Sequence, residues 1–245
     1  MEKIFNKKLI TAVDIGSYSI KVVQIQITGS KNELKINFMK KYFTPEISFE
    51  QEKIKVSKNI KTILNKSLKK DINKMGKLVT TFSSTNLLLR NINLPLMSDD
   101  DLKKAIKLNI NEYFPYSENE LAVEFMKTGE YKNENEVMVI AVKKCILNSY
   151  INLFRELNLK PEVINIQPMA LLSLFEINNQ NLNPIMILDI GFKNSHIVIG
   201  TSKKIFLSRT FQIGGKDFTR EISLNYNFQY EEAERYKIKK MNYEK

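Results

Sequence analysis

The most constraining feature of this sequence is a repeated tripeptide, Asp-Ile-Gly, which occurs at residues 14–16 and again at residues 189–191. Each copy ends an apolar run that is typical of a β-strand, and each is followed by a turn and a second run of alternating polarity. A duplication of this kind indicates two similar supersecondary units that pack around a shared cleft. The chain is therefore expected to fold as two related halves.

The chemistry of this turn suggests a use for it. Glycine lacks a Cβ atom, so Gly16 and Gly191 allow backbone N–H groups to approach an anion closely. Asp14 and Asp189 stand at the strand ends and can hold a hydrated Mg²⁺, which usually binds through few carboxylates and several waters. Two facing turns can then hold the phosphates of one nucleotide. The alternative, that both aspartates only terminate strands, stays open, because Asp and Gly beside turns are commonly structural.

Composition excludes several other classes of protein. One Cys and one His rule out a disulfide framework and argue against a structural zinc site, and no apolar run approaches the roughly 18 to 20 residues that span a bilayer. The net charge of +11 suits an anionic partner, but no basic motif interleaved with aromatic residues predicts nucleic-acid binding. A surface helix at residues 51–70, with lysines between apolar positions, explains the most basic segment. We expect a cytoplasmic protein that does not bind nucleic acid.

A polar stretch at residues 178–184 is the best domain boundary, and the order strand, strand, strand, helix appears on both sides of it. The strands expected before it lie at 9–14, 20–27, 34–38, 77–82, 86–94, 121–125, 137–142 and 163–166, and the helices at 51–70, from Ser98 onward, 146–157 and 167–177. The strands expected after it lie at 185–189, 196–200 and 205–211, and the helices at 216–224 and 230–240. The sequence therefore predicts a mixed α/β fold.

Four segments carry a resemblance to the actin and sugar-kinase superfamily. Residues 14–21 resemble its first phosphate-binding hairpin, and residues 189–196 resemble its second. Residues 213–219 are similar to the segment that enters the outer part of the second lobe. Residues 231–237 resemble the helix whose Glu and Lys reach the adenosine.

A further stretch narrows the resemblance to one family. Residues 94–98, followed by Leu102, Ala105, Ile106 and residues 113–116, are similar to the signature of the PilM proteins of type IV pilus assembly. Residues 139–144 and 159–163 continue the likeness, which covers nearly the whole chain. The sequence is thereby identified as a member of the PilM family, an actin-like group related to the cell-division protein FtsA.

The resemblance implies an α/β, actin-like (ribonuclease H-like) fold with two lobes. The first lobe would occupy residues 1–183 and carry an inserted partner-binding subdomain at about residues 86–143. Residues 184–245 would form part of the second lobe. Family members continue beyond the equivalent of Lys245, so we expect a second lobe that is incomplete at the C-terminus.

The resemblance also implies ATP and Mg²⁺ as cofactors, bound between the lobes. It assigns the phosphates and Mg²⁺ to the first hairpin through Asp14, Gly16, Ser17, Tyr18, Ser19 and Lys21, and to the second through Asp189, Gly191, Asn194 and Ser195. Asp14 and Asp189 would hold the metal through water. Gly214, Gly215, Glu234 and Lys237 would lie toward the ribose and adenine, although Glu234 and Lys237 can equally form a surface ion pair at i, i+3 spacing. Gln167 either orients a water or simply begins a helix.

The expected role is that of a scaffold. In PilM proteins a groove between the inserted subdomain and the rest of the first lobe captures the N-terminal cytoplasmic tail of the membrane protein PilN, which holds the scaffold at the cytoplasmic face of the inner membrane. Pilus motor ATPases are a second class of partner that the resemblance allows. No catalytic base is evident for phosphoryl chemistry, so we expect at most slow ATP hydrolysis. The alternatives are an FtsA-like polymerising division protein and a small-molecule kinase of the same superfold.

Overall fold

The computed structural model describes residues 8–28, 33–43, 48–50, 53–55, 76–82, 87–178 and 184–241. Its largest sheet has five strands in the order β10-β6-β1-β2-β3. Two of its neighbouring pairs, β1–β6 and β6–β10, are parallel, and the other two are antiparallel. The strands are β1 (Lys8–Ile15), β2 (Ser19–Thr28), β3 (Glu33–Phe43), β6 (Lys77–Phe82) and β10 (Val163–Ile166).

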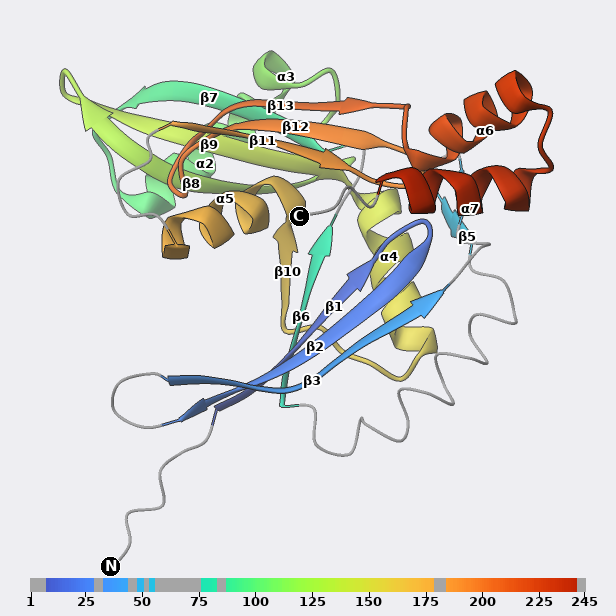
Figure 1. Ribbon diagram of the computed structural model, residues 1–245. Helices are drawn as coiled ribbons and strands as arrows, with labels where there is room; N and C mark the ends of the chain where they lie inside the picture. Colours follow the sequence, from blue (N-terminus) through green and yellow to red (C-terminus); the bar gives the residue numbers. More distant parts are fainter. Residues whose placement is uncertain are drawn as a thin grey trace, which may run out of the picture.

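Helix α4 (Lys144–Glu156) covers one face of this sheet (Figure 1). Its apolar residues recur at helical spacing, and the side chains of Tyr150 and Phe154 are buried in a cluster with Ile20 and Val22 of β2. The Tyr150 hydroxyl donates a hydrogen bond to the backbone oxygen of Thr81, at 2.7 Å. This bond satisfies the one polar atom of an otherwise apolar core side chain.

The segment between β6 and α4 forms a separate three-stranded sheet in the order β7-β9-β8. Its strands are β7 (Leu88–Pro95), β8 (Leu121–Tyr131) and β9 (Glu134–Lys143), and α2 (Asp99–Leu108) and α3 (Ile110–Tyr113) pack on one of its faces. Ser98 caps α2 as the sequence predicts, because its Oγ accepts a hydrogen bond from the Asp101 N–H at 3.2 Å. We call this sheet and its two helices the inserted unit.

The last described segment forms a third sheet, in the order β11-β12-β13, followed by two helices. Its elements are β11 (Ile185–Ile190), β12 (Ser195–Gly200), β13 (Ile205–Phe211), α6 (Gly215–Tyr226) and α7 (Tyr230–Met241). Helix α5 (Gln167–Asn178) joins the sheets, since its Leu172 is buried with Met138 of β9 and Val198 of β12. Figure 1 shows this orange sheet lying beside the green inserted unit.

The predicted order of strands and helices is confirmed on both sides of residues 179–183, which lie outside the described residues. One prediction is wrong in part. Within the expected helix at 51–70, residues Lys53–Lys55 form β5, which pairs with β4 (Ser48–Glu50). The rest of that segment lies outside the described residues. Among the described helices, none is long and apolar enough to cross a membrane.

Candidate functional site: two facing hairpins and a groove

The first hairpin joins β1 to β2 through a tight turn. The Gly16 N–H donates to the backbone oxygen of Ser19 at 3.0 Å, and a Cβ on Gly16 would lie only 3.0 Å from the same oxygen. Asp14 stands opposite Lys21 in the strand register, and the Lys21 Nζ lies 2.9 Å from the Asp14 Oδ2. Ser17 and Tyr18 form the tip of the turn. The hairpin therefore presents one carboxylate, already paired with a lysine, next to a glycine turn.

The second hairpin, between β11 and β12, repeats this geometry. The Gly191 N–H donates to the backbone oxygen of Asn194 at 3.0 Å, and a Cβ on Gly191 would lie 2.7 Å from that oxygen. The Asp189 Oδ2 accepts a hydrogen bond from the Gln167 Nε2 at 2.5 Å. The Gln167 Oε1 is buried and has no hydrogen-bond partner in the described part of the chain. The Ser195 hydroxyl, in contrast, donates to the backbone oxygen of Ile213 at 2.7 Å.

The fold brings the two turns together. The rings of Tyr18 and Phe192 lie 4.9 Å apart between centroids and are tilted by 33°. The Nζ of Lys41, on β3, lies 5.8 Å from the centre of the Tyr18 ring. The two halves of the chain therefore meet at the tips of their duplicated hairpins, as the repeat predicts.

The second turn also docks on the start of α6. The Gly215 N–H donates to the Gly191 oxygen at 2.8 Å, and the Lys216 N–H donates to the Phe192 oxygen at 3.0 Å. Gly214 has no space for a side chain, because a Cβ there would lie 2.5 Å from the Phe192 oxygen. The segment entering α6 is therefore fixed to the hairpin by backbone contacts.

Glu234 and Lys237 lie on α7 and form an ion pair, with the Lys237 Nζ 2.6 Å from the Glu234 Oε2. Their side chains are only 22% and 11% exposed, so the pair is not the surface pair that their spacing also allowed. Lys237 also donates to the Gly215 oxygen at 2.9 Å and to the Thr219 Oγ1 at 2.7 Å, and Thr219 hydrogen-bonds to Glu234. These two residues therefore fasten α7 to the first turn of α6.

His196, the one histidine of the chain, lies opposite Asp189 in the β11–β12 register. Burial lowers the pKa of its imidazole below the ordinary value, and the charge of Asp189 opposes this shift. Its Nδ1 lies 2.9 Å from the Thr210 hydroxyl on β13. His196 is therefore a partly buried residue of the sheet whose charged form is disfavoured by burial.

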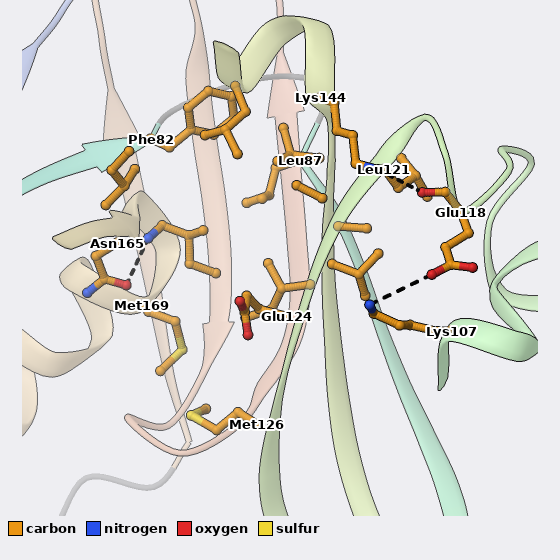
Figure 2. Close-up of a pocket in the computed structure, with 18 of the residues that line it drawn as sticks. Phe82, Leu87, Lys107, Glu118, Leu121, Glu124, Met126, Lys144, Asn165 and Met169 are labelled. Atoms are coloured by element: carbon orange, nitrogen blue, oxygen red, sulfur yellow. Dashed lines mark hydrogen bonds and ion pairs between the residues drawn. The ribbon is translucent and has the colours of Figure 1, made fainter. Parts of the chain in front are cut away.

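A groove of about 570 Å³ lies where the inserted unit meets the five-stranded sheet (Figure 2). Most of its lining is apolar. Its walls come from β8, β9 and α2 of the inserted unit on one side and from β6, β10, α4 and α5 on the other. The lining residues are Phe82, Leu87, Lys103, Lys107, Glu118, Leu121, Ala122, Val123, Glu124, Met126, Ile140, Ala141, Val142, Lys144, Leu147, Ile164, Asn165, Ile166 and Met169.

Two strands that border the groove, β8 and β10, each lie at one edge of their sheet among the described strands. The charged side chains of the groove lie in separate places. Lys107 lies 3.7 Å from Glu118, measured from Nζ to Oε1, and the Lys144 Nζ donates to the Glu118 backbone oxygen at 3.2 Å. Glu124 is set apart from them, toward Met126 and Met169 (Figure 2).

The resemblance to the PilM family implied a groove beside the inserted subdomain but identified none of its lining residues. One signal was available in the sequence, since Ala122, Glu124 and Met126 alternate along β8 and must share a face. A carboxylate between two apolar residues on one strand face is unusual for a core. The Tyr18–Phe192 contact had no such signal, because each residue lies in a turn without periodicity.

Comparisons with known proteins agree with this architecture. A family model described as "Type IV pilus assembly protein PilM" matches residues 12–244. A solved "PilM-PilN type IV pilus biogenesis complex" is similar, with a TM-score of 0.73 and 21% identity over 93% of this chain and 68% of that chain. The cytoplasmic domain of EpsL, an inner-membrane component of the type II secretion system of Vibrio cholerae, has a TM-score of 0.51 and 7% identity over 91% of this chain and 76% of that one. The predicted actin-like α/β fold is thereby confirmed.

Proposed function

The chain belongs to the PilM family of type IV pilus assembly proteins. From this premise we propose that it is an ATP-binding scaffold and that the groove beside the inserted unit holds the N-terminal tail of PilN. The observation that carries the proposal is the groove itself. It is about 570 Å³ in volume, mostly apolar, and bordered by two edge strands. Concave sites of this size and character are typical of ligand-binding sites.

An extended peptide fits these features better than a small molecule does. The strands β8 and β10 lie at the edges of their sheets, where an extended segment can add as a further strand. The apolar side chains between them, such as Leu147 and Ile164, offer pockets for alternate residues of such a strand. The solved complex of a PilM with a PilN has a similar fold, which supports PilN as the source of the peptide.

The facing hairpins support nucleotide binding. The turns at Gly16 and Gly191 each follow a strand-end aspartate, and the Tyr18–Phe192 contact joins the tips of the two hairpins. Within the described ranges no group of three or more His, Cys, Asp or Glu side chains can hold a metal ion. In this proposal Asp14 and Asp189 would hold a hydrated Mg²⁺ through water, and the bound Mg²⁺ would neutralise charge on the phosphates.

The proposed location follows from the partner. A scaffold that holds the cytoplasmic tail of a membrane protein lies at the cytoplasmic face of the inner membrane. Pilus motor ATPases are further partners within this proposal. The role is binding, and at most slow ATP hydrolysis is expected.

The test is a calorimetric titration of the protein with a synthetic peptide of the PilN cytoplasmic tail. The variant Ala122→Arg places a long, charged side chain in the groove, because Ala122 is partly buried in its wall. The matched control is Asn148→Arg, which adds the same charge on the exposed side of α4. We expect Ala122→Arg to weaken binding at least about 30-fold, since it introduces a clash and an unpaired charge.

The control variant should bind the peptide as the wild type does. The proposed function is rejected if the folded wild-type protein does not bind the tail, or if both variants bind it equally well.

A further inference from the structure

Glu124 is a charged residue in the mostly apolar lining of the groove. Side chains alternate along a strand, so Glu124 shares a face of β8 with Ala122 and Met126. Ile140 of β9 stands opposite Glu124 in the sheet register. Met169 of α5 also lines the groove, and Figure 2 shows the carboxylate of Glu124 near Met169 and Met126. A carboxylate therefore sits among apolar side chains.

This carboxylate has no partner in the described part of the chain. No hydrogen bond or ion pair of Glu124 is found there. The nearby carboxylate Glu118 is instead paired with Lys107. Glu124 is still exposed to solvent through the open groove. An occupant that fills the groove would displace the solvent around Glu124. If the carboxylate of Glu124 then had no partner, it would oppose binding.

The balance of charge indicates which occupant avoids this cost. The whole chain carries a net charge of +11 and repels a basic peptide at long range. A short cytoplasmic segment beside a membrane span is nonetheless enriched in Lys and Arg, by the positive-inside rule. Such a peptide needs a local anionic contact, and Glu124 supplies one inside the groove.

On these grounds we propose that Glu124 is a specificity-determining residue that pairs with one Lys or Arg side chain of the docked tail. This inference rests on the proposed function, because it takes the tail of PilN as the occupant. The apolar residues on either side of that basic residue pack against Met126 and Met169, whose flexible side chains adapt to different shapes.

The pair would also set the register of the peptide. Lys107 and Lys144 contact Glu118 at another part of the groove wall, where a second basic side chain is disfavoured. One attractive and one repulsive position along the groove select a single direction for an extended chain, which otherwise makes similar backbone contacts in several registers. Glu124 thus decides which residue of the tail enters the groove.

The test measures fluorescence anisotropy with a labelled tail peptide and a set of peptides in which each Lys or Arg is replaced singly by norleucine. Glu124→Gln keeps the shape of the side chain and removes its charge. Glu130→Gln makes the same change on the same strand but outside the groove, and serves as the control. We expect Glu124→Gln to weaken binding by about 10- to 100-fold, as for a hydrogen bond to a charged group, and Glu130→Gln to leave it unchanged.

The pairing has a second signature. One norleucine peptide should bind the wild-type protein as weakly as the original peptide binds Glu124→Gln, and the two changes together should cost no more than either alone. If wild-type and Glu124→Gln proteins bind the tail equally, the inference is wrong while the proposed function stands. If acetylation of the N-terminus of the tail peptide alone weakens binding as much as Glu124→Gln does, the cation that pairs with Glu124 is the α-amino group, and the inference is also wrong. If the wild type does not bind the tail, both fail.

Discussion

Replacing Gly214 and Gly215 one at a time with alanine should change the stability of the fold very differently, although the two positions are adjacent. A Cβ on Gly214 would lie 2.5 and 2.7 Å from the carbonyl oxygen and carbon of Phe192, and 2.8 Å from the Gly191 oxygen. A Cβ on Gly215 would meet only the Lys237 Nζ at 3.6 Å and the Gly191 oxygen at 3.7 Å, which is ordinary contact. The structure therefore predicts a severe clash at one glycine and none at its neighbour.

The size of each effect follows from what the new methyl group would touch. At Gly214 the obstructing atoms are backbone, held in place by the hydrogen bonds from Gly215 to Gly191 and from Lys216 to Phe192. Relief of the clash must stretch or break these bonds, so the free energy of unfolding should fall by about 3 kcal/mol, at the upper end for overpacking. At Gly215, the first residue of α6, alanine restricts the unfolded chain and should be neutral or stabilise by about 0.5 kcal/mol.

Urea unfolding followed by circular dichroism measures both changes, and the Gly215→Ala protein is the matched control for Gly214→Ala. Equal stability of the two variants, or a larger loss in Gly215→Ala, would refute the described docking of the second hairpin on α6. Because Gly214→Ala should disturb the hairpin turn at Gly191, it should also weaken any Mg-ATP binding.

Two further predictions concern the hairpins. Asp14→Asn and Asp189→Asn should each weaken Mg-ATP binding by about 10- to 100-fold in calorimetry, as expected for groups that orient a hydrated metal. The control Asp100→Asn, at an exposed position, should not change the affinity. Equal affinity in all three variants would contradict the two-hairpin site. His196 should titrate below its usual pKa of about 6.5, because burial disfavours its charged form. The unfolded chain then binds a proton that the folded chain does not, so stability from this group is complete above about pH 6.5 and falls as the pH drops toward the lowered pKa. Proton NMR of the single histidine gives this value directly, and a midpoint at or above 6.5 would disprove the shift.

Much of the fold could be predicted because its signals are local. The strands at 77–82 and 163–166 have the predicted bounds, since each is a short segment rich in apolar and β-branched residues. The start of α2 at Asp99 follows from the Ser98 cap and the acidic first turn. The repeated Asp-Ile-Gly turns predicted that two hairpins would face each other, and the Tyr18–Phe192 contact places their tips together.

What the sequence did not reveal depends on contacts between distant segments. The spacing of Glu234 and Lys237 on a helix is the same for a surface pair and a buried one, and only the packing of α7 on α6 distinguishes them. The groove residues are set by how the inserted unit meets β10 and α5, which no local pattern encodes. The strand at residues 53–55 was missed because its lysines and isoleucine also fit the helical spacing of the segment around it.

The central claim, that the groove holds the PilN tail, is tested most directly by photo-crosslinking. A tail peptide with a benzophenone side chain at one apolar position would be irradiated with the protein, and the attachment sites would be mapped by mass spectrometry. The account predicts attachment at residues 121–126 of β8 and 164–169 of β10 and α5. The exposed apolar face of β11, with Met186 at 69% and Leu188 at 54% exposure, is the strongest competing surface. Attachment there, with none in the groove, would contradict the account.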